Sequence, residues 1–320
     1  MKSILYVRLP CWKIYPEGVI RVADYIHKHE SGIKQFILDL SLAKPGERKT
    51  VLLQAIEELK PAIVAFSWRN IQTFAPHDDG PGAALTTVFK FNYAPSLLDK
   101  LSAVFEGFGL ILDYHFQVRQ NLSYINLAKK KLPHTKIVVG GPAFTIYPEE
   151  IIRQCPQGTI GVIGEGESAL LKIIRDEDLS NEEVIIKKAD GTIVKGEKQK
   201  YFKLEELTPI DFDYIQAIFP DFSSFLDGDV GIQTKRGCPY NCIFCIDNHI
   251  EGKEQRFRNP RMVVEEIEIL NRKFGVDKIW FTDSQFCATE QSIPQAEEVL
   301  DEILPRKLAI QWTGYIRIEN

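Results

Sequence analysis

No apolar run in this 320-residue sequence approaches the roughly 20 residues that a membrane-spanning helix needs. Residues 1–7 lead into an expected strand and do not have the pattern of a secretory signal peptide. Basic residues are not in excess, since the net charge is −5 at pH 7 and the isoelectric point is near 5.8. We therefore expect a globular protein with no membrane span and no general nucleic-acid-binding surface.

The sequence also lacks a G-x-G-x-x-G dinucleotide fingerprint, which argues against an NAD-binding protein. It contains six cysteines, and Cys11, Cys155 and Cys287 are scattered along the chain. The other three are grouped as metal ligands often are, so a disulfide framework is not expected. This usage fits a reducing cytoplasm.

The grouped cysteines are Cys238, Cys242 and Cys245, spaced C-x3-C-x2-C within eight residues. Thiolates this close together in a loop can converge on one metal centre. Gly237 and Pro239 around the first cysteine suit a tight loop after a strand. Because an ordinary iron–sulfur cluster uses four protein ligands, three thiolates would leave one iron open to bind a substrate.

Two other interpretations of the cysteines remain open. His249 follows Cys245 with a C-x3-H spacing, so the three cysteines and His249 could form a tetrahedral zinc site, although zinc modules rarely use this spacing. Alternatively, the three are unrelated buried cysteines.

The first half alternates short apolar strands with amphipathic helices. The pattern predicts strands over 4–9, 35–40, 62–67, 136–139 and 159–163, and helices over 17–29, 51–59, 122–131 and 149–155. Nearly continuous apolar strands alternating with helices are typical of a doubly wound, Rossmann-like parallel α/β sheet. Ligands of such sheets bind outside the carboxyl ends of the strands.

Unusual residues follow these strands at their carboxyl ends. We expect a large flat ligand there, because glycine turns let the backbone approach it closely. The candidate binding residues are Pro10, Ser67, Trp68, Gly140, Gly141, Pro142, Ala143, Gly164, Glu165, Gly166 and Glu167.

Residues 70–121 form a long insertion between the third strand and the next clear helix. Its first part is polar and turn-forming, whereas residues 95–116 carry apolar residues at helical spacing. Long excursions at the ligand edge of a sheet are often functional, so we expect a cap over the ligand or part of a substrate channel. His77, Asp78 and Asp79 could bind a metal, but a solvated loop is the simpler interpretation.

The second half is predicted to be the start of a β/α barrel. A β-hairpin around Asp190-Gly191 and a proline-bearing connector over 204–211 place the domain boundary near 175–225. After the cysteines, Asn259 is expected to cap a helix over 262–274, followed by a strand over 278–282, a helix over 293–303 and a strand over 308–313. We expect domains over 1–175 and 226–320, joined by a hairpin and linker over 176–225.

The cysteine spacing, with an aromatic residue at Phe244, resembles the radical S-adenosylmethionine (SAM) superfamily. The residues 138–145, followed by 148–150 and 164–167, resemble the cobalamin-binding domain fused in front of many of these enzymes. The resemblance implies that Cys238, Cys242 and Cys245 hold a [4Fe–4S] cluster whose open iron binds SAM. It also implies that Phe244 lies beside the adenine, while Asp283 either contacts SAM or caps a helix.

The sequence departs from the family in two respects. The D-x-H-x-x-G motif, whose histidine binds the lower face of cobalt, is absent, and His27, His29 and His134 do not have its context. The chain also holds only about three β/α units before it ends, so the later barrel strands have no counterpart. We therefore expect a lower face without histidine, and a fragment whose activity alone is in doubt.

The resemblance implies a cobalamin-dependent radical SAM enzyme. SAM would be cleaved to a 5′-deoxyadenosyl radical and a methyl group transferred to an unactivated carbon of a small or biosynthetic-intermediate substrate, with flavodoxin or ferredoxin as electron donor. Ring formation or rearrangement with the same cofactors is an alternative. Two others are a non-catalytic cobalamin-binding or sensing protein with a shortened second domain, and a zinc-stabilised binding protein.

Overall fold

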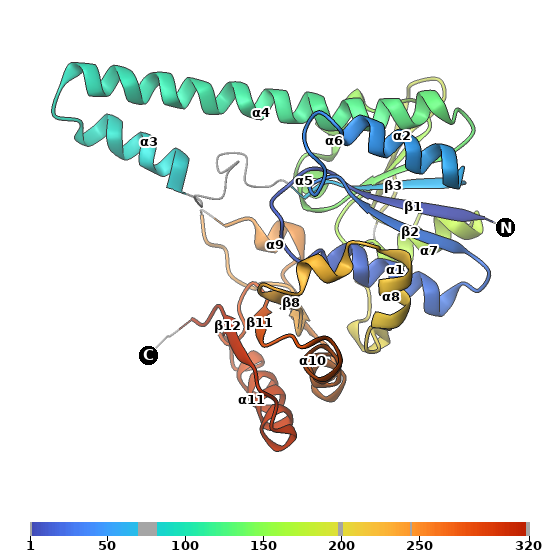
Figure 1. The fold of residues 1–320 in the computed structure, drawn as a ribbon, viewed down its shortest axis with the longest axis vertical. Coiled ribbons are helices and arrows are strands. Elements are labelled where there is room, and N and C mark those ends of the chain that lie inside the picture. The colour runs from blue at the N-terminus through green and yellow to red at the C-terminus, as the bar shows by residue number, and fades with distance from the viewer. Residues whose placement is uncertain (1, 70–81, 198–200, 244, 318–320) are drawn as a thin grey trace.

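The computed structural model of the chain describes residues 2–69, 82–197, 201–243 and 245–317 (Figure 1). Its larger sheet has seven strands. In spatial order they are β2 (Lys34–Asp39), β1 (Ser3–Arg8), β3 (Ile63–Ser67), β4 (Lys136–Gly140), β5 (Thr159–Val162), β6 (Val184–Lys187) and β7 (Ile193–Lys195). The first five are parallel, which confirms the predicted doubly wound α/β sheet.

Helices cover both faces of this sheet, which explains why its strands are apolar nearly throughout. One face carries α2 (Arg48–Leu59), α4 (Leu97–Lys131), α5 (Pro142–Ile146) and α6 (Pro148–Gln154). The other face carries α1 (Glu17–His29), α7 (Glu167–Arg175) and α8 (Phe212–Ile218). The helix predicted over 17–29 has the expected bounds.

The hairpin expected around Asp190-Gly191 is present, but it does more than link two domains. Its strands β6 and β7 are antiparallel, and β6 pairs with β5, so the hairpin extends the sheet. Gly191 lies in the left-handed region at φ +87°, as such a turn requires. The segment 184–195 is therefore part of the first sheet.

The second half contains a three-stranded parallel sheet in the order β12 (Gln311–Gly314), β11 (Lys278–Phe281), β8 (Val230–Ile232). Helices α10 (Pro260–Phe274) and α11 (Ser292–Ile303) connect its strands. Asn259 caps α10 as predicted, since its side-chain oxygen accepts hydrogen bonds from the backbone N–H of Arg261 at 3.0 Å and of Met262 at 3.4 Å. The short antiparallel strands β9 (Lys235–Arg236) and β10 (Arg256–Phe257) flank the cysteine loop and α9 (Asp247–Ile250).

The insertion is a helical hairpin wherever the structure describes it. Helix α3 (Gly82–Tyr93) turns into α4, a 35-residue helix that also contains the helix predicted over 122–131. The hairpin projects from the body beyond the carboxyl edge of the sheet (Figure 1). Residues 70–81, which include His77, Asp78 and Asp79, lie outside the described residues.

The two halves share one hydrophobic core. The cluster that contains Ile20 of α1 and Val138 of β4 also contains Ile267 of α10 and Phe281 of β11. The short helices η1 (Leu204–Glu206) and η2 (Phe222–Phe225), on the connecting segment, contribute to it too, whereas η3 (Leu304–Arg306) lies on the surface. Among the described residues, no helix combines the length and apolar character needed to cross a bilayer.

Candidate cofactor site

A cavity of about 280 Å³ lies at the carboxyl edge of the large sheet, where the two halves of the chain meet. The cavity is an apolar slot between strands β1, β4 and β5 and helices α1 and α7. Its lining includes Tyr6, Val138 and Leu170. The second half closes the slot with Gln233, Arg236, Ile250 and Glu251. The cavity is thus bounded both by the sheet edge and by the segment that carries the cysteines.

Most of the predicted cobalamin-binding residues line this cavity. Those that do are Ser67, Gly140, Gly141, Pro142, Gly164, Glu165, Gly166 and Glu167. Pro10, Trp68 and Ala143 do not line it, and the latter two are buried in the core behind the strand ends. The sequence pattern therefore located the edge of the sheet but did not separate the residues that line the cavity from those that pack behind it. Cobalamin binding by these residues stays a prediction.

Gly141 is needed for the close packing of the backbone at the strand ends. Its φ is +97°, and a Cβ atom there would lie 2.8 Å from the carbonyl oxygen of Trp68. The backbone N–H of Trp68 donates to the carbonyl of Gly140, and the carbonyl of Trp68 accepts from the N–H of Ala143. The glycine is required because the ends of β3 and β4 approach each other here.

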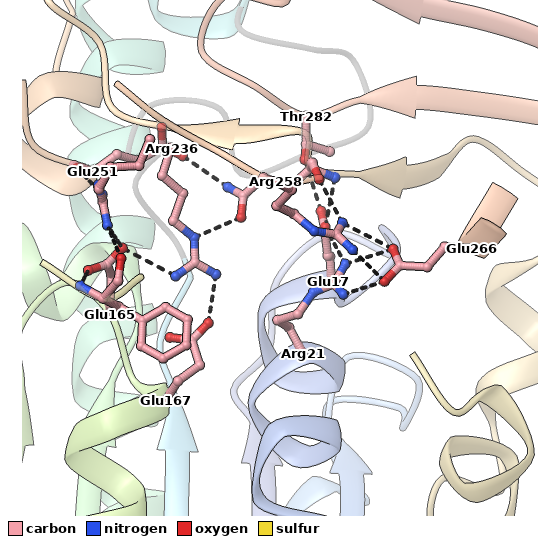
Figure 2. Close-up of polar contacts among 12 residues, drawn as sticks. Glu17, Arg21, Glu165, Glu167, Arg236, Glu251, Arg258, Glu266 and Thr282 are labelled. Atoms are coloured by element: carbon pink, nitrogen blue, oxygen red, sulfur yellow. Dashed lines mark hydrogen bonds and ion pairs between the residues drawn. The ribbon is translucent and has the colours of Figure 1, made fainter. Parts of the chain in front are cut away.

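The carboxylates of Glu165 and Glu167 bind the second half of the chain (Figure 2). Arg236 donates to Glu167 at 2.6 Å and to Glu165 at 3.3 Å, and Arg256 donates to Glu165 at 2.5 Å. These glutamates were predicted as cofactor residues. In the structure, their charges are neutralised by arginines that flank the cysteine loop, so they join the two halves beside the cavity.

A second network, which the sequence did not predict, joins α1 to α10 (Figure 2). Glu266 pairs with Arg21 at 2.6 Å and with Arg258 at 2.6 Å, and all three side chains are buried. Glu17 accepts hydrogen bonds from the backbone N–H of Gln233 at 2.8 Å and from the hydroxyl of Thr282 at 2.9 Å. The sequence does contain one sign of this network, because Arg21 and Glu266 are charged residues within the apolar stripes of α1 and α10.

The three cysteines lie on the loop between β9 and β10. Cys238 is buried, whereas Cys242 and Cys245 are partly exposed. The backbone N–H of Cys238 donates to the carbonyl of Gly252, and that of Cys245 donates to the carbonyl of Cys242. Phe244, predicted to lie beside adenine, is outside the described residues. The loop returns to the cavity through Ile250 and Glu251, so it borders the sheet edge.

Among the described residues, no group of three or more His, Cys, Asp or Glu side chains is arranged to hold one metal ion. In an iron–sulfur cluster the cysteines bind different iron atoms and so stand farther apart than the ligands of one ion. The cluster and the Cys3His site with His249 both stay predictions. Burial raises the pKa of Cys238, and the neighbouring Asp247 and Cys242 raise it further. A bound cationic metal centre would stabilise these thiolates.

The cysteine loop depends on Gly237. Its φ is +97°, and a Cβ atom at this position would lie 1.9 Å from the carbonyl oxygen of Glu254. The carboxylate of Glu251 accepts from the N–H of Gly237 at 3.2 Å and from the hydroxyl of Ser284 at 3.0 Å. Burial raises the pKa of Glu251 to about 7.

Asp283 lies buried beside the segment that precedes the cysteines. Its carboxylate is fully buried and accepts from the backbone N–H groups of Thr234 and Lys235, and from the hydroxyl of Thr234 at 2.6 Å. It is not a helix N-cap, because α11 begins at Ser292. These hydrogen bonds fix the segment before the cysteines. Contact between Asp283 and SAM stays a prediction.

At about 280 Å³ the cavity is smaller than a corrin ring with its side arms, so it could hold one arm and not the whole group. Among the described residues that line it, none is a histidine. The slot is mostly apolar with polar groups at its mouth, which is typical of cofactor sites.

Known proteins resemble this chain in sequence and in fold. Residues 107–174 match the B12 binding domain family model. The chain is 28% identical over 201 residues to an uncharacterized methyltransferase of Pyrococcus horikoshii, covering 61% of this chain and 42% of that protein. It is 24% identical over 207 residues to the anaerobic magnesium-protoporphyrin IX monomethyl ester cyclase of Cereibacter sphaeroides, covering 61% of this chain and 33% of that protein.

Among solved structures, the chain resembles the radical SAM methyltransferase TsrM from Kitasatospora setae with cobalamin and a [4Fe–4S] cluster bound. The TM-score is 0.68 at 20% identity, and the match covers 96% of this chain and 52% of that one. The fold is that of the cobalamin-binding radical SAM enzymes, and the resemblance found in the sequence is confirmed. The chain spans about half the length of TsrM and less than half of the curated relatives.

Proposed function

We propose that this chain binds cobalamin, a [4Fe–4S] cluster and SAM, and takes part in radical methyl transfer to an unactivated carbon. The observation that carries the proposal is the position of the cysteine loop, which contributes Ile250 and Glu251 to the cavity that Gly140 and Gly164 also line. A cofactor across the strand ends would therefore lie beside the cluster.

The residues divide into three groups in this proposal. Cys238, Cys242 and Cys245 hold the cluster, with Phe244 beside the adenine of SAM. The strand ends at Ser67, Gly140 and Gly164 lie under the corrin, and the apolar slot takes one of its arms. When bound, the cluster and SAM supply a 5′-deoxyadenosyl radical and cobalamin supplies a methyl group, while the protein orients these groups and excludes water.

The relatives support two outcomes of the radical chemistry. The P. horikoshii protein is named a methyltransferase and TsrM is one, which favours methyl transfer. The cyclase of C. sphaeroides favours ring formation as the second candidate. In either case, we expect a small-molecule substrate and a flavodoxin or ferredoxin as electron donor in a reducing cytoplasm.

Anaerobic reconstitution with iron and sulfide tests the ligand set. We expect broad absorbance near about 400 nm, as for cysteine-ligated clusters, and its loss in Cys242→Ala. Cys155→Ala, which changes a cysteine in the core of the first sheet, should keep it. Stoichiometric zinc without iron would contradict the proposal, as would a cluster that survives in Cys242→Ala.

A second experiment separates the enzyme from a cobalamin-binding protein without catalysis. The reconstituted chain is mixed with hydroxocobalamin and SAM under a strong reductant, and the release of 5′-deoxyadenosine is measured. The proposal predicts both corrinoid binding in gel filtration and 5′-deoxyadenosine release. Corrinoid binding alone would support the non-catalytic alternative.

A further inference from the structure

The helical hairpin formed by α3 and α4 has an inner face that is well packed. Ala103 is 1% exposed, and a Cβ atom on Gly107 would lie 3.5 Å from the side chain of Thr87 on α3. Lys90 of α3 pairs with Glu106 of α4 at 2.8 Å. These contacts define the side of α4 that faces α3.

The opposite side of α4 carries an apolar stripe that the described residues do not cover. At about 100° per residue, most of the stripe residues fall on the side of the helix away from Ala103 and Gly107. Six of them, Leu97, Leu101, Val104, Phe108, Leu112 and Phe116, follow one another at intervals of three or four residues, as in a helix–helix seam. The stripe consists of Leu97, Leu98, Leu101, Val104, Phe105, Phe108, Leu112 and Phe116, which are 44% to 78% exposed.

The area of this stripe is sufficient for a stable protein interface. Phe105, Phe108 and Phe116 are 74%, 61% and 66% exposed. With about 200 Å² per aromatic side chain, these three alone expose roughly 400 Å², about half of what one partner contributes to a standard interface of ~800 Å² per side. The five aliphatic residues supply the remainder. An exposed apolar patch of this size marks an interaction site.

The charges around the stripe favour a protein partner over a membrane. Residues 82–119 contain three basic residues, Lys90, Lys100 and Arg119, and three acidic ones, Asp99, Glu106 and Asp113. An amphipathic helix that binds anionic lipid has a basic polar face, which is missing here. On this side of α4, between Leu97 and Phe116, the sequence places no Asp, Glu, Lys or Arg, and His115 is its one ionisable residue, so two copies can meet without placing permanent like charges opposite each other.

We infer that the apolar stripe of α4 binds the same stripe of a second copy of this chain. In this arrangement the two α4 helices pack antiparallel against each other, with each α3 on the outer side, and the contact is isologous, as in two-fold dimers. One end of each hairpin is attached to its body (Figure 1), so the direction of packing decides how far apart the two bodies lie. Antiparallel packing separates the two bodies, whereas parallel packing would bring them together.

The mass of the chain in solution tests this inference. Sedimentation equilibrium over a range of concentrations should give a dimer, and the pair Phe105→Glu with Phe108→Glu should weaken dimerisation about 100-fold or more, as loss of two central apolar anchors does. The matched control places the same charges at exposed apolar residues outside the hairpin, Ile293→Glu with Leu304→Glu, and should not change the mass. A monomeric wild-type chain, or a dimer that persists in the Phe105/Phe108 variant, would overturn the inference.

Cross-linking tests the direction of packing. Leu98→Cys and Phe116→Cys lie at opposite ends of the stripe, so a mixture of the two variants should form a disulfide-linked dimer. Neither variant alone should do so above the background of the unsubstituted chain. Cross-linking of each variant with itself would show parallel packing and overturn the antiparallel arrangement. If the chain is a monomer and binds phosphatidylcholine vesicles through Phe105 and Phe108, the stripe binds lipid and the inference of a second copy is overturned.

Discussion

Glu266 is a buried carboxylate held between two arginines. Burial alone raises the pKa of this carboxyl, but the guanidinium groups of Arg21 and Arg258 outweigh that effect and lower it to about 2. Replacing it with glutamine would leave two buried positive charges without their partner. We expect Glu266→Gln to lower the free energy of unfolding by about 3–5 kcal/mol, as breaking buried ion pairs does.

Thermal or urea unfolding measures this effect. Glu265→Gln is the matched control, because Glu265 is the exposed neighbour on the same helix, and it should change stability by no more than about 0.5 kcal/mol. If both variants unfold alike, the buried network does not hold the two halves together as the structure implies.

Glu251 makes the stability of the protein depend on pH. Its pKa of about 7 lies above the ordinary value of 4.5 for a glutamate, so between these pH values the folded protein keeps a proton that the unfolded chain has lost. The free energy of unfolding therefore falls as the pH rises from about 4.5 to about 7, and stays low above that range. Glu251→Gln should remove this fall, with a gain of at most about 3 kcal/mol at pH 8.

Unfolding at pH 5 and pH 8 checks the prediction for Glu251. The free energies of unfolding of the wild type and of Glu251→Gln should differ more at pH 8 than at pH 5. The control Glu254→Gln, at an exposed glutamate three residues away, should follow the wild-type pH dependence. An unchanged pH slope in Glu251→Gln would mean that this carboxyl titrates normally.

Among the structural elements, the cysteine loop is the one most sensitive to a single methyl group. Gly237→Ala places a Cβ atom 1.9 Å from a backbone oxygen at a φ of +97°, and neither the backbone nor a rotamer change can relieve this. We expect the loop to change shape and iron per chain after reconstitution to fall to about that of Cys242→Ala. The circular dichroism of the large sheet should remain.

The control for Gly237 is a glycine with free space around it. Gly228→Ala introduces a Cβ atom with no neighbour within 4 Å and should bind iron like the wild type. Normal iron content in Gly237→Ala would show that the loop conformation is not needed to hold a cluster.

The elements that the sequence predicted are those whose pattern is local. The strands of the first sheet alternate with helices at regular spacing, and Asn259 with Pro260 marks the start of α10, so these elements were predicted to within a few residues. The role of Asp283 was not predictable, because its partners Thr234 and Lys235 lie almost fifty residues earlier in the chain. The helical spacing over 95–116 was recognised, and these residues lie in α4, but the direction of the α3–α4 hairpin was not predictable, since nothing local fixes where it points.

At the scale of the whole molecule, the two halves behave as one folded unit. They share a hydrophobic core, and salt bridges cross between them at two places, Glu165 and Glu167 with Arg236, and Arg21 with Glu266. The sequence predicted the two parts separately. It could not predict the contact between them, because Arg21 and Glu266 are 245 residues apart in the chain.

The contact beside the cavity leads to a last prediction. Arg236→Gln keeps a hydrogen-bond donor but removes the positive charge between Glu165 and Glu167, both of which are nearly buried. Arg256 still pairs with Glu165, but the buried carboxylate of Glu167 loses its charged partner, so the second half should separate from the sheet before the sheet unfolds. We expect one thermal transition in the wild type and two in Arg236→Gln, together with weaker hydroxocobalamin binding.

The control is Arg272→Gln, which changes an exposed ion pair with Glu268 and should keep one transition. A single transition at the wild-type temperature in Arg236→Gln would show that the shared hydrophobic core alone joins the halves.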